Sequence, residues 1–350
     1  MTMSKHGWTY KKFEDCLKKF KTPSKIKSSE YYRSGLYPVI SQEQEYISGY
    51  NNSAEKIFHH DKPVVVFGDH SRVVKYVDFD FIVGADGVKI LLVRDELNPR
   101  FFYYYIKWID VQSLGYSRHY KVLKENYIPV PPMGEQEAIV AELDEINSAI
   151  DELKLQVADL GTLAQATFYD MFGDPVTNPK AWPVKKLGEV CFLKAGKNIK
   201  ASELSQKPSE GLYPCYGGNG IRGYIAKKSH EGCFPIIGRQ GALCGNVVLA
   251  TGSFYATEHA VVCQPLEELN TIFLFFALKE MNLNQYAKGV AQPGLAVSSI
   301  TPLFLPIPPM PLQQEFAARV KAIEEAKAEL KAQMADMQAL LASRMQYWFD

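Results

Sequence analysis

The chain has 350 residues, of which 47% are hydrophobic, and its 39 basic and 39 acidic residues give a formal net charge of zero. This length and apolar content suffice for two or more folded domains and exclude a disordered chain. No apolar run approaches the roughly 18 residues that span a bilayer, and the start of the sequence lacks a signal-peptide apolar region, so we expect a cytoplasmic protein without membrane segments.

The six cysteines form no C-x-x-C pair, so we expect reduced cysteines that lie mostly in the core, with no zinc site and no other cofactor. Charge is distributed unevenly along the chain. Residues 1–133 carry 20 Lys and Arg against 15 Asp and Glu, residues 182–310 carry 12 against 8, and residues 134–181 carry 2 against 10. A polyanion should therefore meet the two basic segments rather than the acidic one between them.

The first basic segment, residues 1–133, predicts a mixed α/β globule. Runs of β-branched and aromatic residues are typical of strands at 63–67, 79–83 and 88–93, and residues 98–108 are typical of a short buried helix. Gly-rich turns separate the runs.

Two loops of this globule carry side chains that suit nucleic-acid binding. His70 and Arg72 follow the first apolar run, and Arg118, His119 and Lys121 alternate with tyrosines further along. Basic residues interleaved with aromatic ones favour phosphate contacts. The alternative interpretation is that both loops are simply solvated.

Residues 134–173 predict a long spacer helix, introduced by the proline-rich segment 127–133. Its apolar residues recur in steps of three and four, at Ile139, Leu143, Ile146, Ile150, Leu153, Val157, Leu160, Ala164 and Phe168. Such a heptad seam is typical of a coiled coil. We interpret the carboxylates beside it, such as Glu142 and Asp144, as a solvated face, or as a face that repels DNA or docks a partner.

Residues 174–310 predict a second mixed α/β globule, with strand-like runs at 234–237, 247–250 and 260–263 and a helix at 269–281. Residues 311–350 predict a second spacer helix. Its seam has the same rhythm, with Phe316, Val320, Ile323, Leu330, Met334, Met337, Leu341 and Met345, and Lys327 interrupts it at one position. Two long helices with matching seams can bury each other.

The second globule also has two loops with candidate contacts. A Gly-rich turn holds Asn219 and Arg222 beside Tyr216, and its alternative interpretation is a tight hairpin whose tyrosines pack. Arg239 and Gln240 follow an apolar run, and Arg can read guanine while Gln can read adenine. The alternative for Arg239 is an arginine that holds a neighbouring loop.

The two halves of the chain correspond to each other. Trp8 to Phe13 matches Trp182 to Leu187, residues 35–38 match 211–214, and the proline-rich segments fall in step, which indicates a duplication of about 175 residues. If the halves share a pseudo-two-fold axis, the helices run antiparallel and the C-terminus ends near Met1. The predicted fold class is therefore α+β, with two pseudo-symmetric mixed α/β globules joined by two long antiparallel helices that form a coiled coil.

These features together resemble the specificity subunit of type I restriction-modification systems. The resemblance covers nearly the whole chain and rests on the duplication, on the runs 217–224 and 237–241, and on the helix starts at Gln136 and Gln314. It implies two target recognition domains, residues 1–133 and 174–310, which read the halves of an asymmetric, split double-stranded DNA site. The helices would hold these domains apart and dock two methyltransferase subunits, with restriction or translocase subunits as further partners.

Catalytic motifs are missing from the sequence. The Asn-Pro pairs at 98–99 and 178–179 lack the second proline of an amino-methyltransferase loop, and Gly196-Lys197 fails the P-loop pattern. We therefore expect a non-catalytic subunit. Two alternatives stay open: a coiled-coil scaffold whose duplicated globules bind proteins, and an enzyme that uses scattered pairs such as Glu258 with His259 or Asp69 with His70.

Overall fold

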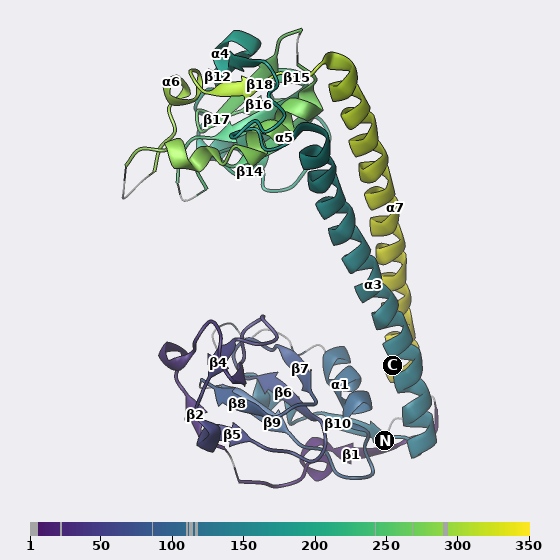
Figure 1. Cartoon of the computed structure of the whole chain (residues 1–350). Coiled ribbons are helices and arrows are strands. Elements are labelled where there is room, and N and C mark those ends of the chain that lie inside the picture. Colours follow the sequence, from purple (N-terminus) through teal and green to yellow (C-terminus); the bar gives the residue numbers. More distant parts are fainter. Residues whose placement is uncertain are drawn as a thin grey trace. The chain divides into compact units, whose positions relative to one another are not determined.

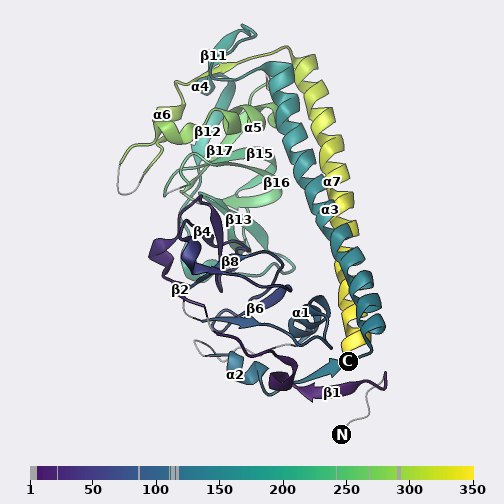
Figure 2. The same ribbon diagram turned by 60° about the horizontal axis from the view of Figure 1, so that its bottom comes forward.

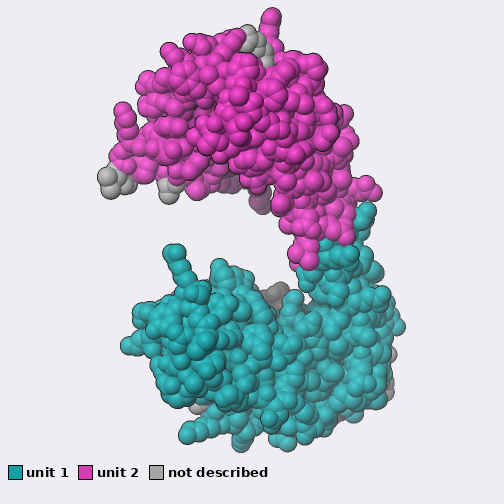
Figure 3. Space-filling model, viewed as in Figure 1, with its two compact units in different colours: residues 1–153, 333–350 teal, residues 154–332 magenta. Residues whose placement is uncertain are grey.

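The computed structural model describes residues 6–21, 23–85, 87–109, 111, 115, 118–241, 243–267, 269–289 and 293–350. The chain divides into two compact units, residues 1–153 with 333–350 and residues 154–332, which Figure 3 colours teal and magenta. Each unit contains one globule and one end of each of two long helices, α3 (Met133–Phe172) and α7 (Met310–Phe349), which are labelled in Figure 1.

The globule of unit 1 is built from short strands and short helices. Its strands are β1 (Thr9–Lys12), β2 (Lys25–Ile26), β3 (Tyr37–Ile40), β4 (Gly49–Asn51), β5 (Ile57–Phe58), β6 (Val64–Gly68), β7 (Val74–Val77), β8 (Phe81–Gly84), β9 (Val88–Leu91) and β10 (Tyr127–Val130). Its helices are α1 (Pro99–Trp108) and α2 (Tyr120–Leu123), with 3-10 turns η1 (Phe13–Cys16), η2 (Ser28–Glu30) and η3 (Ala54–Lys56). The strands form a sheet in the order β7-β6-β9, a second sheet in the order β2-β8-β3-β4 with β5 on β8, and a β1-β10 ribbon.

The globule of unit 2 gathers its strands into one larger sheet. Its strands are β11 (Val184–Lys186), β12 (Cys191–Ala195), β13 (Tyr213–Gly217), β14 (Gly220–Ile225), β15 (His230–Gly238), β16 (Val247–Ala256), β17 (Ala260–Pro265) and β18 (Phe304–Pro306). Its helices are α4 (Leu187–Val190), α5 (Thr271–Glu280) and α6 (Val297–Ile300), with 3-10 turns η4 (Ala201–Glu203) and η5 (Leu283–Tyr286). The sheet order is β12-β17-β15-β16-β13-β14, and β11 pairs with β18 in a separate ribbon.

The two globules share a common frame. A central strand, β6 in unit 1 and β15 in unit 2, pairs antiparallel with its neighbours on both sides. The predicted strand runs coincide with strands in both copies, although β15 and β16 extend well beyond the predicted residues. Their extra length comes from residues 230–233 and 251–256, whose glycines and serine dilute the apolar signal.

The long helices run antiparallel. In unit 1, near the start of α3, Glu142 accepts hydrogen bonds from Arg344 Nη2 (3.1 Å) and Trp348 Nε1 (3.0 Å), near the end of α7. In unit 2, Phe168 and Phe172 at the end of α3 pack on Phe316 at the start of α7, with ring centroids 5.6 and 5.3 Å apart. Each unit thus joins the start of one helix to the end of the other, as Figures 1 and 2 show. The predicted coiled coil is confirmed.

The predicted heptad seam matches the burial pattern of both helices. The seam positions near the helix ends, among them Ile139, Leu143, Phe168 and Phe316, are buried because the globules cover them. The positions between Leu153 and Leu160, and between Leu330 and Leu341, are only half-buried. The middle of each helix therefore has little apolar cover apart from its partner helix.

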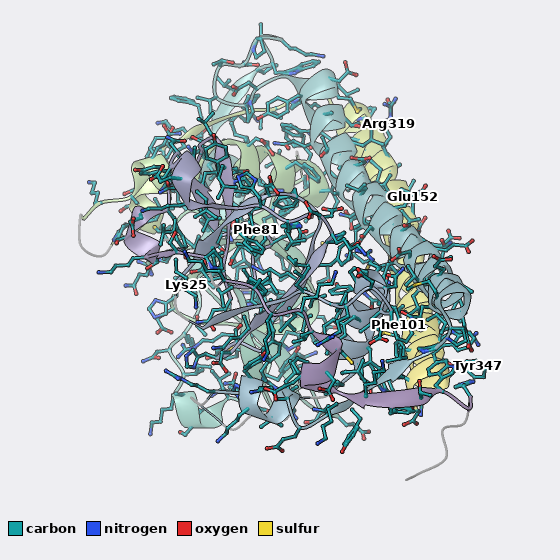
Figure 4. All side chains as sticks on the ribbon, turned by 90° about the horizontal axis from the view of Figure 1, so that it is seen from below. Lys25, Phe81, Phe101, Glu152, Arg319 and Tyr347 are labelled. Carbon is teal, nitrogen blue, oxygen red and sulfur yellow. The ribbon has the colours of Figure 1, made fainter. Side chains whose placement is uncertain are left out.

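The end of α7 completes the core of unit 1. Phe349 is 7% exposed and packs edge-on against Phe101 and Tyr105, at centroid distances of 5.6 and 5.4 Å. The Tyr347 carbonyl lies 3.0 Å from His6 Nε2, so the C-terminal helix ends beside the N-terminal segment as predicted; Figure 4 labels Phe101 and Tyr347. Met1 itself lies outside the described residues.

A buried glutamine anchors the start of each long helix. Gln136 accepts a hydrogen bond from the Asn98 amide (2.7 Å) and donates to the carbonyls of Glu96 (2.9 Å) and Pro131 (2.8 Å). Gln313 accepts one from the Asn270 amide (2.8 Å) and donates to the Pro308 carbonyl (2.8 Å). Both glutamines are fully buried, whereas Gln314 is exposed. Gln313, not Gln314, is therefore the structural counterpart of Gln136.

The cysteines are core residues in the main. Five of them, Cys16, Cys191, Cys215, Cys244 and Cys263, are buried, and Cys233 is half-buried. Burial raises the pKa of Cys191 to about 12 and contributes most to raising that of Cys16 to about 11, so these thiols stay protonated at neutral pH. None of the helices in the described ranges is long and apolar enough to cross a bilayer.

Candidate nucleic-acid interface

The central strand of each globule ends in the same backbone junction. In unit 1, the Asp69 amide donates to the Gly87 carbonyl (2.7 Å), and the Asp69 carbonyl accepts from the His119 amide (2.8 Å). In unit 2, the Arg239 amide donates to the His259 carbonyl (2.9 Å), and the Arg239 carbonyl accepts from the Leu295 amide (2.8 Å). One frame therefore carries two different sets of loop side chains.

In unit 1 this junction brings together the two predicted contact loops. The turn after β6 holds His70, whose amide donates to Gln42 Oε1 (3.1 Å), and Arg72, which has a φ of +62°. A positive φ is unusual for a residue with a side chain, and here it closes the tight turn between β6 and β7. Arg72 is exposed, and its Nη1 donates to the Val111 carbonyl (2.9 Å).

The second predicted loop of unit 1 contains one buried and two exposed candidates. His119 is 1% exposed, and its Nδ1 donates to the Asp69 carbonyl (3.0 Å). Asp69 Oδ1 accepts from the Tyr120 amide (2.9 Å), which ties the start of α2 to the strand end. His119 is thus placed to support the loop, whereas Arg118 and Lys121 are exposed on either side of it.

In unit 2, Arg239 holds neighbouring loops. Its Nε donates to the Leu295 carbonyl and its Nη1 to the Glu258 carbonyl, both at 3.2 Å. These contacts agree with the alternative interpretation, in which Arg239 holds a neighbouring loop. The side chain is half-buried, so part of it stays accessible. Gln240 is exposed, and its backbone forms an isolated antiparallel β-bridge with Gly294. Of the two predicted contacts in this loop, Gln240 has the more accessible side chain.

The Gly-rich turn of unit 2 is the hairpin between β13 and β14. Tyr216 is buried and packs edge-on against Phe254 at 5.5 Å, and this burial raises the pKa of Tyr216. Asn219, at the tip, accepts from Asn246 Nδ2 (2.9 Å), and Arg222 is exposed on β14. Tyr216 therefore packs in the core, as the alternative interpretation of a tight hairpin expects, whereas Asn219 and Arg222 are exposed.

The hairpin tip lies against the end of β15. A Cβ on Gly238 would come within 1.9 Å of the Gly218 carbonyl oxygen, so only glycine permits this approach. The contact places Asn219, which follows Gly218, next to the loop of Arg239 and Gln240. Arg222 follows three residues later on β14.

Residues 257–259 are part of the same strand end, and sequence reasoning had considered them only as a possible catalytic pair. Glu258 Oε1 lies 3.0 Å from His259 Nε2. Thr257 Oγ1 and Glu258 Oε2 are buried without a hydrogen-bond partner among the described residues. A polar Thr-Glu-His run between two apolar strands is the sequence signal for this turn.

The model of one protein family matches both halves of the chain. It describes the type I restriction modification DNA specificity domain and covers residues 5–158 and 179–336. The chain belongs to this family. It holds two copies of the domain, each of which ends within one of the long helices. The predicted family is therefore confirmed, and the family of specificity subunits is non-catalytic, as predicted.

Curated relatives carry the same designation. The chain is 50% identical over 135 residues to the Escherichia coli type I restriction enzyme EcoprrI specificity subunit, an alignment that covers 38% of this chain and 34% of that protein. It is 26% identical over 185 residues to the Escherichia coli EcoR124I/EcoR124II specificity subunit, covering 49% and 46% of the two chains. The chain thus spans a third to a half of the length of these relatives.

Solved structures extend the fold likeness over the whole chain. The S subunit of the type I restriction-modification system from M. genitalium superposes with a TM-score of 0.61 at 18% identity, covering 98% of this chain and 96% of that one. A second structure, from work on complex assembly of the type I system, gives a TM-score of 0.55 at 15% identity, covering 98% and 97%. At these identities the likeness concerns the fold.

Proposed function

We propose that this chain is the DNA-reading subunit of a cytoplasmic type I restriction-modification complex. The observation that carries the proposal is a duplicated scaffold whose strand-end loops have diverged. In unit 1, Arg72 and Arg118 lie in loops and Lys121 lies in α2; in unit 2, Arg222 lies on β14 and Gln240 in the loop after β15. Arg and Gln suit base edges, and Lys suits phosphates.

Because the loops differ while the frame repeats, each globule should read a different half-site. The target is then asymmetric and bipartite, with a spacer that no side chain reads. A helix of 40 residues is roughly 60 Å long at ~1.5 Å per residue. Half-sites on one face of the duplex lie about one to one and a half turns apart, at ~34 Å per turn, a distance that such a spacer can hold.

The helices offer surface for protein partners. Leu155 and Leu163 on α3 are 66% and 50% exposed, and Leu340 on α7 is 44% exposed. Apolar side chains outside the helix seam favour docking of further helices. We assign these surfaces to two modification subunits, one for each half of the duplication, with restriction subunits joining the complex through them.

Methylation mapping of the host genome tests the proposal. The expected result is a modified motif in two unlike parts with a constant gap, lost when this gene is deleted. Exchange of residues 174–310 for those of a relative should change one part and leave the other part and the gap unchanged. A continuous or palindromic motif, or a motif that survives deletion, would contradict the proposed function.

A further inference from the structure

The two globules differ in the segment that follows η1 in unit 1 and α4 in unit 2. In unit 2 this segment is a strand of the main sheet, and in unit 1 it is not. In unit 2, this segment is β12, which pairs antiparallel with β17 from Cys191↔Pro265 to Ala195↔Val261. In unit 1, the corresponding segment is held by the Leu17↔Val93 bridge and by two backbone hydrogen bonds, from the Arg94 amide to the Cys16 carbonyl (2.9 Å) and from the Lys18 amide to the Leu92 carbonyl (2.7 Å). The described residues between Lys18 and Lys25 form no strand beside β9, and a groove lies where unit 2 has β12.

This groove has a volume of about 800 Å³. We call it the lysine groove because its basic lining residues are Lys18, Lys19, Lys25, Lys89 and Arg94. Lys25 is labelled in Figure 4. The acidic lining residues are Glu14 and Asp15. Glu14 forms an ion pair with Lys124, which holds the pKa of the Glu14 carboxyl below its usual value. Lys18 is likewise paired with Asp95 (2.8 Å), so the excess of positive charge in the groove comes from its other four basic side chains.

The lysine groove adjoins the strand-end junction of unit 1. Lys89 Nζ lies 3.6 Å from Asp69 Oδ2 and 5.4 Å from the centroid of the Tyr120 ring. Tyr120 lines the groove and stands between His119 and Lys121, next to the loop that the proposed function assigns to DNA. Lys89 and Tyr120 therefore connect the lysine groove to the strand-end junction.

We propose that the lysine groove binds the sugar-phosphate backbone of DNA beside the half-site read by unit 1. This inference rests on the proposed function and adds to it a contact that carries no sequence information. Four of the five cations are lysines, which act on phosphate as point charges, whereas base reading favours the forked guanidinium of arginine. Because β12 fills the corresponding place in unit 2, the two half-sites are held unequally.

The test removes three exposed charges from the groove. The variant is Lys19→Gln, Lys25→Gln and Arg94→Gln in the full chain, purified with whatever subunits accompany it, and the probe is a duplex that carries the mapped target. A control variant, Lys207→Gln, Lys321→Gln and Lys331→Gln, loses the same charge from exposed positions of unit 2.

Each phosphate contact contributes about 0.9 to the slope of log affinity against log salt, so the groove variant should lower the slope by about 2.7. When salt is raised from about 50 to 200 mM, the factor by which DNA binding weakens should be roughly 40 times smaller for the groove variant than for the wild type. The mapped motif should not change, and the control variant should keep the wild-type slope. The single change Lys19→Gln should lower the slope by about 0.9, which covers the case in which the triple variant folds poorly.

Three outcomes would overturn the inference. An unchanged slope in the groove variant, while the wild type binds DNA normally, would remove the groove and leave the proposed function intact. An equal fall in the control variant would show that net charge alone matters. A poly-glutamate peptide that binds the wild type but not the groove variant, with DNA binding unaffected, would assign the open edge of β9 to an acidic protein segment. Failure of the wild type to bind DNA would instead refute the proposed function itself.

Discussion

Replacement of Gln136 by leucine tests whether the buried glutamine stabilises the junction between globule and helix. Leucine has a similar volume but no polar atoms, so the variant loses three hydrogen bonds, at 2.7, 2.9 and 2.8 Å. The net value of such a bond is about 1 kcal/mol, and each backbone group left without a partner costs about 1–3 kcal/mol. We therefore expect unit 1 to lose at least ~3 kcal/mol of unfolding free energy.

Two measurements can detect this loss. For a unit of this size, about 3 kcal/mol corresponds to a fall in Tm of roughly 6–12 °C. Hydrogen exchange at the Asn98 amide, the donor to Gln136, should accelerate by more than about 100-fold, because 1.4 kcal/mol is a factor of ten. The Asn270 amide lies in unit 2 and should keep its exchange rate.

A matched pair on the second helix provides the control. Gln313→Leu should destabilise unit 2 in the same way, since Gln313 bonds to Asn270 and Pro308. Gln314→Leu changes an exposed side chain and should stay within about 0.5 kcal/mol of the wild type. The reasoning would be refuted if Gln136→Leu left the Tm and the Asn98 exchange rate unchanged, or if Gln314→Leu were as harmful as Gln313→Leu.

Three further changes have defined outcomes. Phe349→Ala should cost unit 1 about 3–5 kcal/mol in urea unfolding, because it leaves a cavity among buried aromatic rings; a cost under about 1 kcal/mol would show that the helix end is dispensable. Hydrogen bonds from Arg344 lower the pKa of Glu142, so their stabilisation is present above the unfolded pKa and is lost as pH falls through the folded one. Arg344→Met should therefore flatten the dependence of Tm on pH below about 4.5, the ordinary pKa of the glutamate, and an unaltered profile would count against the pair. Arg239→Ala removes the side-chain donors to the Leu295 and Glu258 carbonyls, so the segment at Leu295 should open more often and the Leu295 amide should exchange faster; specific DNA binding should weaken by ~1–3 kcal/mol only if the arginine also reads a base.

The helix pair was predictable because a heptad pattern reports burial directly. Every predicted seam position from Ile139 to Met345 is buried or half-buried, and Lys327, which interrupts the seam, keeps its ammonium on Glu324 at 2.7 Å. The carboxylates beside the seam were less predictable. Glu142 binds Arg344 across the helices, and Asp144 binds Arg100 at 2.8 Å, so these two do not belong to a solvated face. Periodicity shows which side is apolar but not which charges meet.

The sequence predicted Gln314 as the counterpart of Gln136, whereas the structure shows that Gln313 takes this position. Matching residue types alone aligns either glutamine with Gln136, whereas helical phase distinguishes them. Gln136 precedes the seam residue Ile139 by three positions, and Gln313 precedes Phe316 by three, so both face inward. Gln314 precedes Phe316 by two and faces outward. The sequence contains this signal, but reading it requires the seam first.

The candidate interface was predictable as loops but not as individual side chains. His119 becomes buried through a contact with Asp69, fifty residues earlier in the chain, which no local pattern indicates. Tyr216 is buried by Phe254 in the same long-range manner. The lysine groove was missed because it exists only through the absence of a strand that the other copy has. The domain boundaries at 133, 173 and 310 stay a prediction.

The burial of Phe349 in unit 1 has a consequence for biosynthesis. The ribosome finishes residues 1–153 and must then make the whole of residues 154–332 before the last helix can supply its aromatic end. At ~5–20 residues per second, the nascent first globule waits on the order of 10–40 s with Phe101 and Tyr105 uncovered. During that interval these apolar side chains raise the tendency of the nascent chain to aggregate, and a chain that ends before the last residues of α7 would leave them uncovered.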